Sequence, residues 1–156
     1  MAEQERFVPD ILVGPSILEQ KDVDAVNRLM KQLSDSAQDI NRNKLTDILC
    51  QPNFRIIIFK DPGTDEVIGM ASLYYYKAIC APLGIGKVED VVIDKRYRGK
   101  GLGDLLVKYL ISLSKSLKLQ ILELTSDPDN PERLPAIELY KKHGFKERGG
   151  YFYLDL

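Results

Sequence analysis

Apolar positions along this chain recur with two different spacings. Residues 101–115 predict the clearest amphipathic helix, since their apolar side chains follow the i, i+3, i+4, i+7 spacing of one helical face. Further helices are expected over residues 22–33, over 42–49, and from Pro135 to a glycine cap at Gly144. Runs rich in β-branched and aromatic residues predict strands over 11–13, 54–59, 67–76, 88–93 and 119–124, and a final pair from Phe145 that turns at Gly149-Gly150.

The order of these elements constrains the fold class. The strand over 88–93, the helix over 101–115 and the strand over 119–124 form a βαβ unit, which requires the two strands to be parallel. The strands over 54–59 and 67–76 flank a turn and predict a hairpin. We therefore expect an α/β protein whose sheet is mixed, with parallel and antiparallel strands, as in an α+β arrangement. A length of 156 residues fits one domain over 1–156.

Composition and charge restrict the function classes. Apolar residues make up 44% of the chain and charged residues 29%, and the formal net charge is -1, which argues against binding to nucleic acid or to an anionic membrane. No apolar run is long enough for a membrane span, and the first residues do not resemble a signal peptide. The two cysteines, Cys50 and Cys80, are expected to be buried, and they suit a reducing cytoplasm. A single histidine and the lack of a C-x-x-C pair predict no metal site.

A glycine-rich turn precedes the helix over 101–115. It reads Arg98-Gly99-Lys100-Gly101-Leu102-Gly103, and Asp104 follows it. Amide N–H groups at a helix start lack intrahelical acceptors and attract anions, so the turn predicts a phosphate site. It does not fit a P-loop, since no Ser or Thr follows Gly99-Lys100, and it does not fit the G-x-G-x-x-G fingerprint of a Rossmann fold.

The turn does match the Arg/Gln-x-x-Gly-x-Gly/Ala motif of the GNAT N-acetyltransferase superfamily, which the chain resembles over roughly residues 10 to 155. The segment from Leu139 to Phe145 is similar to the late Leu-Tyr-x-x-x-Gly-Phe signature of that family. The resemblance implies a mostly antiparallel sheet in which the strands over 88–93 and 119–124 run parallel and splay apart.

The same resemblance implies acetyl-CoA as co-substrate and no metal. Backbone groups of the strand over 88–93 are expected to hold the pantetheine arm, and amides of the turn to hold the diphosphate. Arg133 is either a further contact to the cofactor or a solvated residue at a helix start. The residues implied for the cofactor are Val91, Val92, Ile93, Arg98, Gly99, Lys100, Gly101, Leu102, Gly103, Asp104 and Arg133.

Transfer of the acetyl group needs an acid, a base and an oxyanion donor. By resemblance Tyr140 is the acid near the sulfur, the alternative being a core-facing tyrosine. Glu89 is the preferred base, or else a substrate anchor, and the N–H of Val91 is the oxyanion donor. Strand alternation predicts Glu89 on the face of Val91 and Ile93, with Asp90 on the other face.

The acceptor is less defined than the cofactor. The family implies direct transfer to a primary amine of a small molecule or peptide. Residues 86–92 also resemble glucosamine-6-phosphate N-acetyltransferases, which makes Lys87, Glu89 and Asp90 candidate substrate contacts, although the last residues contain no arginine for a phosphate. One ring among Tyr74, Tyr75 and Tyr76 is a further candidate. A non-catalytic acetyl-CoA sensor stays a third interpretation, and dimers are common in the family.

Overall fold

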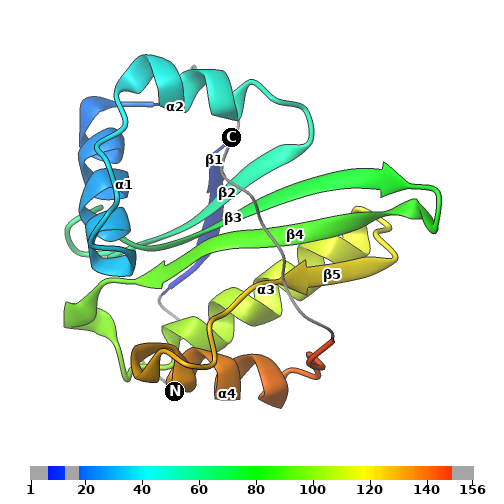
Figure 1. The fold of residues 1–156 in the computed structure, drawn as a ribbon. Coiled ribbons are helices and arrows are strands. Elements are labelled where there is room, and N and C mark those ends of the chain that lie inside the picture. Colours follow the sequence, from blue (N-terminus) through cyan, green and yellow to red (C-terminus); the bar gives the residue numbers. More distant parts are fainter. Residues whose placement is uncertain (1–6, 13–17, 149–156) are drawn as a thin grey trace. The chain divides into compact units, whose positions relative to one another are not determined.

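A five-stranded sheet is the framework of the protein, as the computed structural model shows for the described residues, 7–12 and 18–148 (Figure 1). The chain forms two compact units, Met1–Thr125 and Ser126–Leu156. The strands of the first unit are β1 (Pro9–Leu12), β2 (Phe54–Lys60), β3 (Val67–Ala78), β4 (Ala81–Ile93) and β5 (Ile121–Leu124). Its helices are α1 (Gln20–Leu33), α2 (Arg42–Leu49) and α3 (Leu102–Ser116), with a 3-10 turn η3 at Lys95–Tyr97. The second unit contains a 3-10 turn η4 at Pro131–Arg133 and helix α4 (Leu134–Lys142).

The strands follow the order β1-β2-β3-β4-β5 across the sheet. The first four pair antiparallel, and β4 and β5 pair parallel through the register Ile85↔Ile121 to Val88↔Leu124. This arrangement confirms the predicted mixed α/β sheet, including the parallel pair across the βαβ unit.

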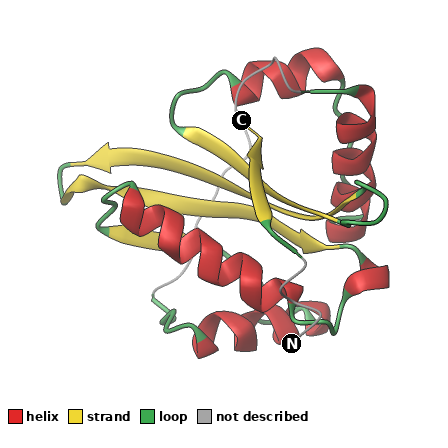
Figure 2. Cartoon of the chain, turned by 180° about the vertical axis from the view of Figure 1, so that it is seen from behind, coloured by secondary structure: helices red, strands yellow, loops and turns green. Residues whose placement is uncertain are grey.

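Helices cover both faces of the sheet (Figure 2). On one face, α1 and α2 pack on the sheet through a cluster that includes Val26, Leu45, Ile56 and Met70. On the other face, Leu106 of α3 lies in a second cluster with side chains of β2, β3 and β4. Each cluster takes alternate residues of the strands, because successive side chains of a strand point to opposite faces.

Local sequence determines where the first two helices begin. At the start of α1, the Glu19 amide donates to Oδ2 of Asp22 at 2.9 Å and the Glu19 side chain accepts in return, which forms a capping box. At the start of α2, Oδ1 of Asn41 accepts from the Lys44 amide at 3.0 Å. The predicted range of 42–49 for α2 is therefore confirmed, and α1 begins two residues earlier than predicted.

The largest difference from the prediction lies in β4, which begins at Ala81 rather than at residue 88. Residues 82–86 contain a proline and two glycines, which are poor strand formers. For this reason the sequence pattern did not predict the first half of β4. The structure explains Gly86, because a Cβ there would lie 2.8 Å from Cδ1 of Leu119. Glycine at this position allows the close approach of the segment that leads into β5.

Three smaller expectations need correction or lie outside the described residues. Cys50 and Cys80 are exposed rather than buried, since Cys50 caps the end of α2 and Cys80 lies in the turn between β3 and β4. The predicted strand from Phe145 is absent over residues 145–148, and the turn at Gly149-Gly150 lies outside the described residues.

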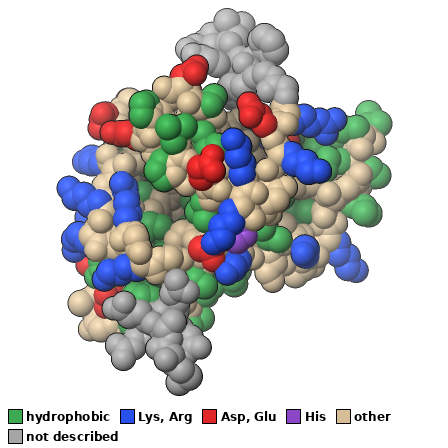
Figure 3. Space-filling view, turned by 90° about the horizontal axis from the view of Figure 1, so that it is seen from below, with side chains coloured by type: hydrophobic (Ala, Val, Ile, Leu, Met, Phe, Trp, Pro, Cys, Tyr) green, Lys and Arg blue, Asp and Glu red, His purple; other side chains and the backbone are tan. Residues whose placement is uncertain are grey.

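The surface of the molecule carries both signs of charge. Figure 3 shows acidic and basic side chains interspersed over one face, with hydrophobic side chains between them. Within the described ranges, none of the helices is long and apolar enough to cross a membrane.

Candidate active site

An irregularity in β4 shapes the centre of the candidate site. The register with β3 shifts between Met70↔Val92 and Ser72↔Glu89, so β4 contains one more residue than β3 over this interval. The extra residue is at a β-bulge, and Asp90 has a left-handed φ of 48° there. Aspartate tolerates this backbone conformation better than most residues do.

The bulge corrects the predicted orientation of Glu89. Directly opposed residues of an antiparallel pair point to the same face, so Glu89 lies on the face of its partner Ser72. Val91 and Ile93 instead pack against the cluster on the α3 face. The prediction that Glu89 shares their face is wrong, because simple alternation does not hold across an inserted residue.

The two neighbouring carboxylates differ in their surroundings. The Glu89 carboxylate is partly exposed and forms an ion pair of 2.9 Å with the Lys87 ammonium. The Asp90 carboxylate accepts a hydrogen bond of 2.8 Å from Oγ of Ser72. The bulge thus places both acids on the α1–α2 side of the sheet.

Beyond the bulge, the edge of β4 that faces β5 has no partner strand within the described ranges. The parallel register ends at Val88↔Leu124, and no strand within the described ranges pairs with residues 89–93 on that side. An extended ligand can hydrogen bond to such an edge as an additional strand does. The edge contains Val91, Val92 and Ile93, as predicted for the pantetheine segment, although its binding role stays a prediction.

The glycine-rich turn follows η3 and leads directly into α3. Gly99 and Gly101 have φ angles of 77° and 80°, and Gly101 is the N-cap of α3. The Leu105 amide donates to the Gly101 carbonyl at 3.2 Å, so the amides of Leu102, Gly103 and Asp104 precede the first helical hydrogen bond. A Cβ at Gly99 would meet no atom within 4 Å, which shows open space beside the turn.

Side chains near the glycine-rich turn form contacts with neighbouring residues. Nε of Arg98 donates to the Ile93 carbonyl at 3.0 Å, and Nζ of Lys100 lies 5.2 Å from the centre of the Tyr97 ring. The Asp104 carboxylate pairs with Nζ of Lys108 at 2.6 Å, one turn along α3. Asp104 is thereby held close to the positive end of the helix dipole, which it stabilises.

Asp94 is the buried anchor between β4 and the turn, a role that the sequence did not reveal. Its carboxylate accepts from the amide, Nε and Nη2 of Arg96 at 3.0, 3.1 and 2.8 Å, and Nε of Arg28 lies 3.4 Å away. The hydrogen bonds from Arg96 hold the pKa of Asp94 well below its usual range, although burial opposes this shift. Asp94 fixes the position at which the chain leaves the strand.

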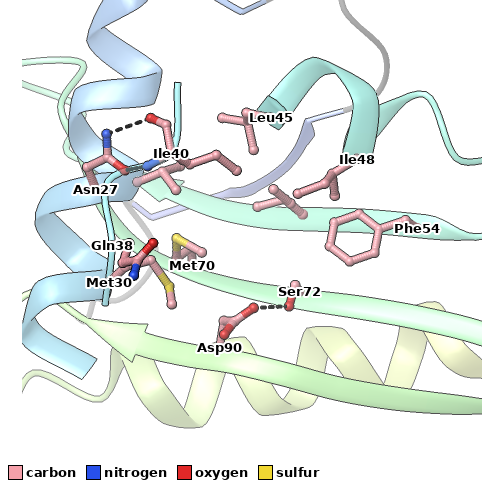
Figure 4. Close-up of a pocket in the computed structure, with 12 residues that line it drawn as sticks. Asn27, Met30, Gln38, Ile40, Leu45, Ile48, Phe54, Met70, Ser72 and Asp90 are labelled. Atoms are coloured by element: carbon pink, nitrogen blue, oxygen red, sulfur yellow. Dashed lines mark hydrogen bonds between the residues drawn. The ribbon is translucent and has the colours of Figure 1, made fainter. Parts of the chain in front are cut away.

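A pocket of about 170 Å³ lies between α1, α2 and the sheet, beside the bulge (Figure 4). Asp90 and Ser72 lie at one end of it, and Asn27 and Gln38 are its other polar lining residues. Both amide atoms of Asn27 bond to the backbone of Ile40, at 2.9 and 2.8 Å, which fixes the connection between the two helices along one wall. Local sequence patterns did not predict this pocket, since it depends on packing between segments that are distant in the chain.

The tyrosine cluster does not line this pocket. Tyr74 and Tyr76 are exposed and stack with ring centres 5.8 Å apart. Tyr75 packs against the cluster on the α3 face, and its hydroxyl donates to the Pro52 carbonyl at 2.9 Å. Of the three rings, Tyr75 is therefore the one that packs against a core cluster.

The second unit contains the predicted acid. Tyr140 lies on α4, is only 8% exposed, and has its ring centre 5.9 Å from that of Phe145. Burial raises the pKa of Tyr140, while the nearby charge of Arg133 lowers it. Arg133 occupies the N-cap position of α4, and Gly144 ends the helix with φ 87° as predicted. The described residues contain no group of three or more potential metal ligands.

The sequence matches the model of a known protein family. The model described as acetyltransferase (GNAT) family matches residues 24–145. The match includes the whole of β4, the glycine-rich turn, α3 and α4.

Curated proteins with similar sequences include glucosamine 6-phosphate N-acetyltransferases. The chain is 27% identical over 143 residues to the protein of that name from Trypanosoma brucei brucei, which covers 90% of this chain and 93% of the relative. Matches to proteins named as probable members of that class from Drosophila melanogaster and rice span 43% and 55% of those proteins.

Solved structures share the fold. A crystal structure of a Trypanosoma brucei acetyltransferase aligns with a TM-score of 0.73 at 26% identity, covering 96% of this chain and all (100%) of that one. A metagenomic aminoglycoside acetyltransferase in complex with sisomicin aligns with a TM-score of 0.82 at 13% identity, covering 98% of both chains. The second likeness concerns the fold alone.

Proposed function

This chain belongs to the GNAT acetyltransferase family, and from that premise we propose that it transfers an acetyl group from acetyl-CoA directly to a primary amine. The observation that carries the proposal is the glycine-rich turn at the start of α3, which follows the part of β4 that has no partner strand on its β5 side within the described ranges. Both features belong to the first unit, and both have the backbone geometry that a diphosphate with an extended arm requires.

The residues of the turn fit the diphosphate of acetyl-CoA. Gly99 has open space where a side chain would stand, and the left-handed Gly101 presents the first amides of α3. When bound, acetyl-CoA supplies an activated thioester. The pantetheine arm is assigned to backbone groups of Val91, Val92 and Ile93. The diphosphate is assigned to the amides from Arg98 to Asp104, and Arg133 is a predicted additional contact.

The reaction requires two proton movements. A bond forms between the amine nitrogen and the acyl carbon, and the bond from that carbon to the sulfur of CoA breaks. The amine loses a proton, and the sulfur gains one. We assign Tyr140 to protonation of the sulfur and Glu89 to removal of the amine proton, directly or through water. The N–H of Val91 is assigned to stabilisation of the oxyanion. A tyrosine phenol is protonated at neutral pH, as an acid requires, and burial raises the pKa of Tyr140 further above that range.

A thiol-release assay tests the proposal. The full chain is mixed with acetyl-CoA and a panel of amines, and free thiol is measured over time. We expect thiol release that depends on both the amine and the protein. Binding of acetyl-CoA without amine-dependent release would instead support the non-catalytic sensor.

Replacing Tyr140 by phenylalanine tests the assigned acid. We expect the Tyr140→Phe variant to lose about 100-fold in kcat, a typical value for general acid catalysis, with little change in the Kd of acetyl-CoA. Thiol release and calorimetry measure the two quantities separately. The Tyr109→Phe variant, which removes a hydroxyl from α3, is the matched control. A parallel loss of turnover and of affinity would show that Tyr140 supports the fold or the cofactor instead.

A second candidate acceptor comes from the curated relatives. Their names make glucosamine 6-phosphate a specific acceptor to test. Lys87 and Glu89, predicted to contact such a substrate, lie as an ion pair on the α1–α2 side of the sheet.

A cytoplasmic location, the lack of nucleic-acid or membrane partners, and a homodimer also stay predictions.

A further inference from the structure

The pocket beside the β4 bulge has a mostly apolar lining. Of its twelve lining residues, eight are apolar, and the four polar ones are Asn27, Gln38, Ser72 and Asp90. Its volume of about 170 Å³ is similar to that of an engineered cavity of about 150 Å³ that binds benzene. The pocket therefore has room for one ring-sized apolar group.

One carboxylate oxygen in the pocket is available to a charged ligand. Asn27 uses its amide on Ile40, and Ser72 donates its hydroxyl proton to Oδ2 of Asp90. Within the described part of the chain, the other carboxylate oxygen of Asp90, Oδ1, has no hydrogen-bond partner. A carboxylate at the end of an apolar pocket favours a cation, since a partner there offsets the cost of its partial burial.

Cations that would hold a phosphate are missing from the pocket lining. None of the described residues that line it is Lys or Arg. Lys87, on the same side of the sheet, is already paired with Glu89 at 2.9 Å. Of the ranges 1–6, 13–17 and 149–156, only the first contains a Lys or Arg, namely Arg6. The charge of the pocket thus complements an ammonium group and opposes a phosphate.

From these observations we infer that the acceptor is a primary amine attached to a compact apolar group, with its ammonium at Asp90 and its apolar body between α1, α2 and the sheet. The inference rests on the proposed acetyl transfer and specifies its acceptor. Asp90 is the binding residue that receives the ammonium. The amine becomes nucleophilic once its proton leaves, for which Glu89 stays the predicted base.

Acceptor kinetics with five amines test the inference. The amines are 2-phenylethylamine, isopentylamine, ethanolamine, glucosamine and glucosamine 6-phosphate, each assayed for thiol release from acetyl-CoA by the full chain. We expect kcat/KM for 2-phenylethylamine to exceed that for ethanolamine and for glucosamine 6-phosphate at least tenfold. Turnover of glucosamine 6-phosphate as efficient as that of 2-phenylethylamine, or better, would overturn the inference and leave the proposed acetyl transfer intact.

Two variants test whether binding of the amine depends on the carboxylate in the pocket. Asp90→Asn keeps the left-handed backbone accessible but removes the charge, and we expect it to raise KM for 2-phenylethylamine about tenfold. Asp47→Asn is the matched control, because it removes an exposed carboxylate from α2 outside the pocket lining, and it should leave KM unchanged. Equal KM values in Asp90→Asn and in the unmodified chain would contradict the inference.

Direct binding separates this inference from the proposed function. Calorimetry of the full chain with 2-phenylethylamine requires no turnover. Binding that weakens in Asp90→Asn, without thiol release for any amine, would support the pocket assignment and reject the acetyl transfer. Absence of both binding and turnover would reject both.

Discussion

Replacing Gly101 by glutamate is expected to abolish acetyl-CoA binding, with at least about a 100-fold increase in Kd, equivalent to about 2.7 kcal/mol. Gly101 has a φ of 80° at the N-cap of α3, where a side chain other than Asn or Asp strains the backbone. A carboxylate there also opposes a diphosphate bound at the same helix start. Calorimetric titration with acetyl-CoA measures the change.

The Gly101→Asn variant is the control for the backbone. Asparagine tolerates a left-handed φ and is a good N-cap, so it adds a side chain without a charge and with little strain. We expect it to fold normally and to bind acetyl-CoA more tightly than the glutamate variant. An unchanged affinity in Gly101→Glu would remove this turn from the cofactor site.

The second large effect is expected at Asp94, where the change to asparagine should lower the free energy of unfolding by about 2 to 3 kcal/mol. The Asp94 side chain is fully buried, whereas the guanidinium of Arg96 is half exposed and can regain water when its partner loses charge. The expected loss is therefore smaller than that for a fully buried pair. Urea denaturation followed by circular dichroism measures the difference.

The pH dependence of that difference follows from the pKa shift of Asp94. The folded pKa is depressed, so the carboxylate contributes its stability above the unfolded value of about 3.9 and loses it as pH falls towards the folded pKa. The difference in free energy of unfolding between the two proteins should be constant between pH 5 and 7 and should shrink progressively as pH falls below about 4.

Asp65→Asn is the matched control for Asp94. Asp65 pairs with Lys21 at 3.0 Å and with Lys60 at 3.3 Å, but its side chain is largely exposed. An exposed pair contributes about 0 to 1 kcal/mol, so this variant should remain close to the unmodified protein. A loss as large as that of Asp94→Asn would show that burial is not the cause.

Periodicity and turn chemistry were sufficient for most of the first unit. The leucine stripe of α3 and the glycines before it predicted both the helix and the turn, because each signal lies within a short segment. The same holds for α2 and for the parallel pairing across α3. The first half of β4 was missed, because Gly86 is explained by the side chains of Leu73, Leu119 and Leu122, which are distant in sequence.

The candidate site was predicted in part. Asp90 was named as a substrate contact, but the bulge that turns Glu89 to the same side depends on the pairing with Ser72 and not on local sequence. The role of Asp94 requires Arg28 and Arg96 to meet at one carboxylate. Such features arise from tertiary packing, which the order of apolar and polar residues does not encode.

The two hydrogen bonds between Asn27 and Ile40 have an evolutionary consequence. These bonds hold the connection between α1 and α2 in place, whereas the glycine-rich turn belongs to a separate segment after β4. Substitutions that reshape the wall of the pocket therefore leave the glycine-rich turn unchanged. Under the proposed function, lineages that inherit this scaffold can diversify in the amines they modify while retaining acetyl-CoA as donor, and shared ancestry alone is then a poor guide to the amine that each descendant acetylates.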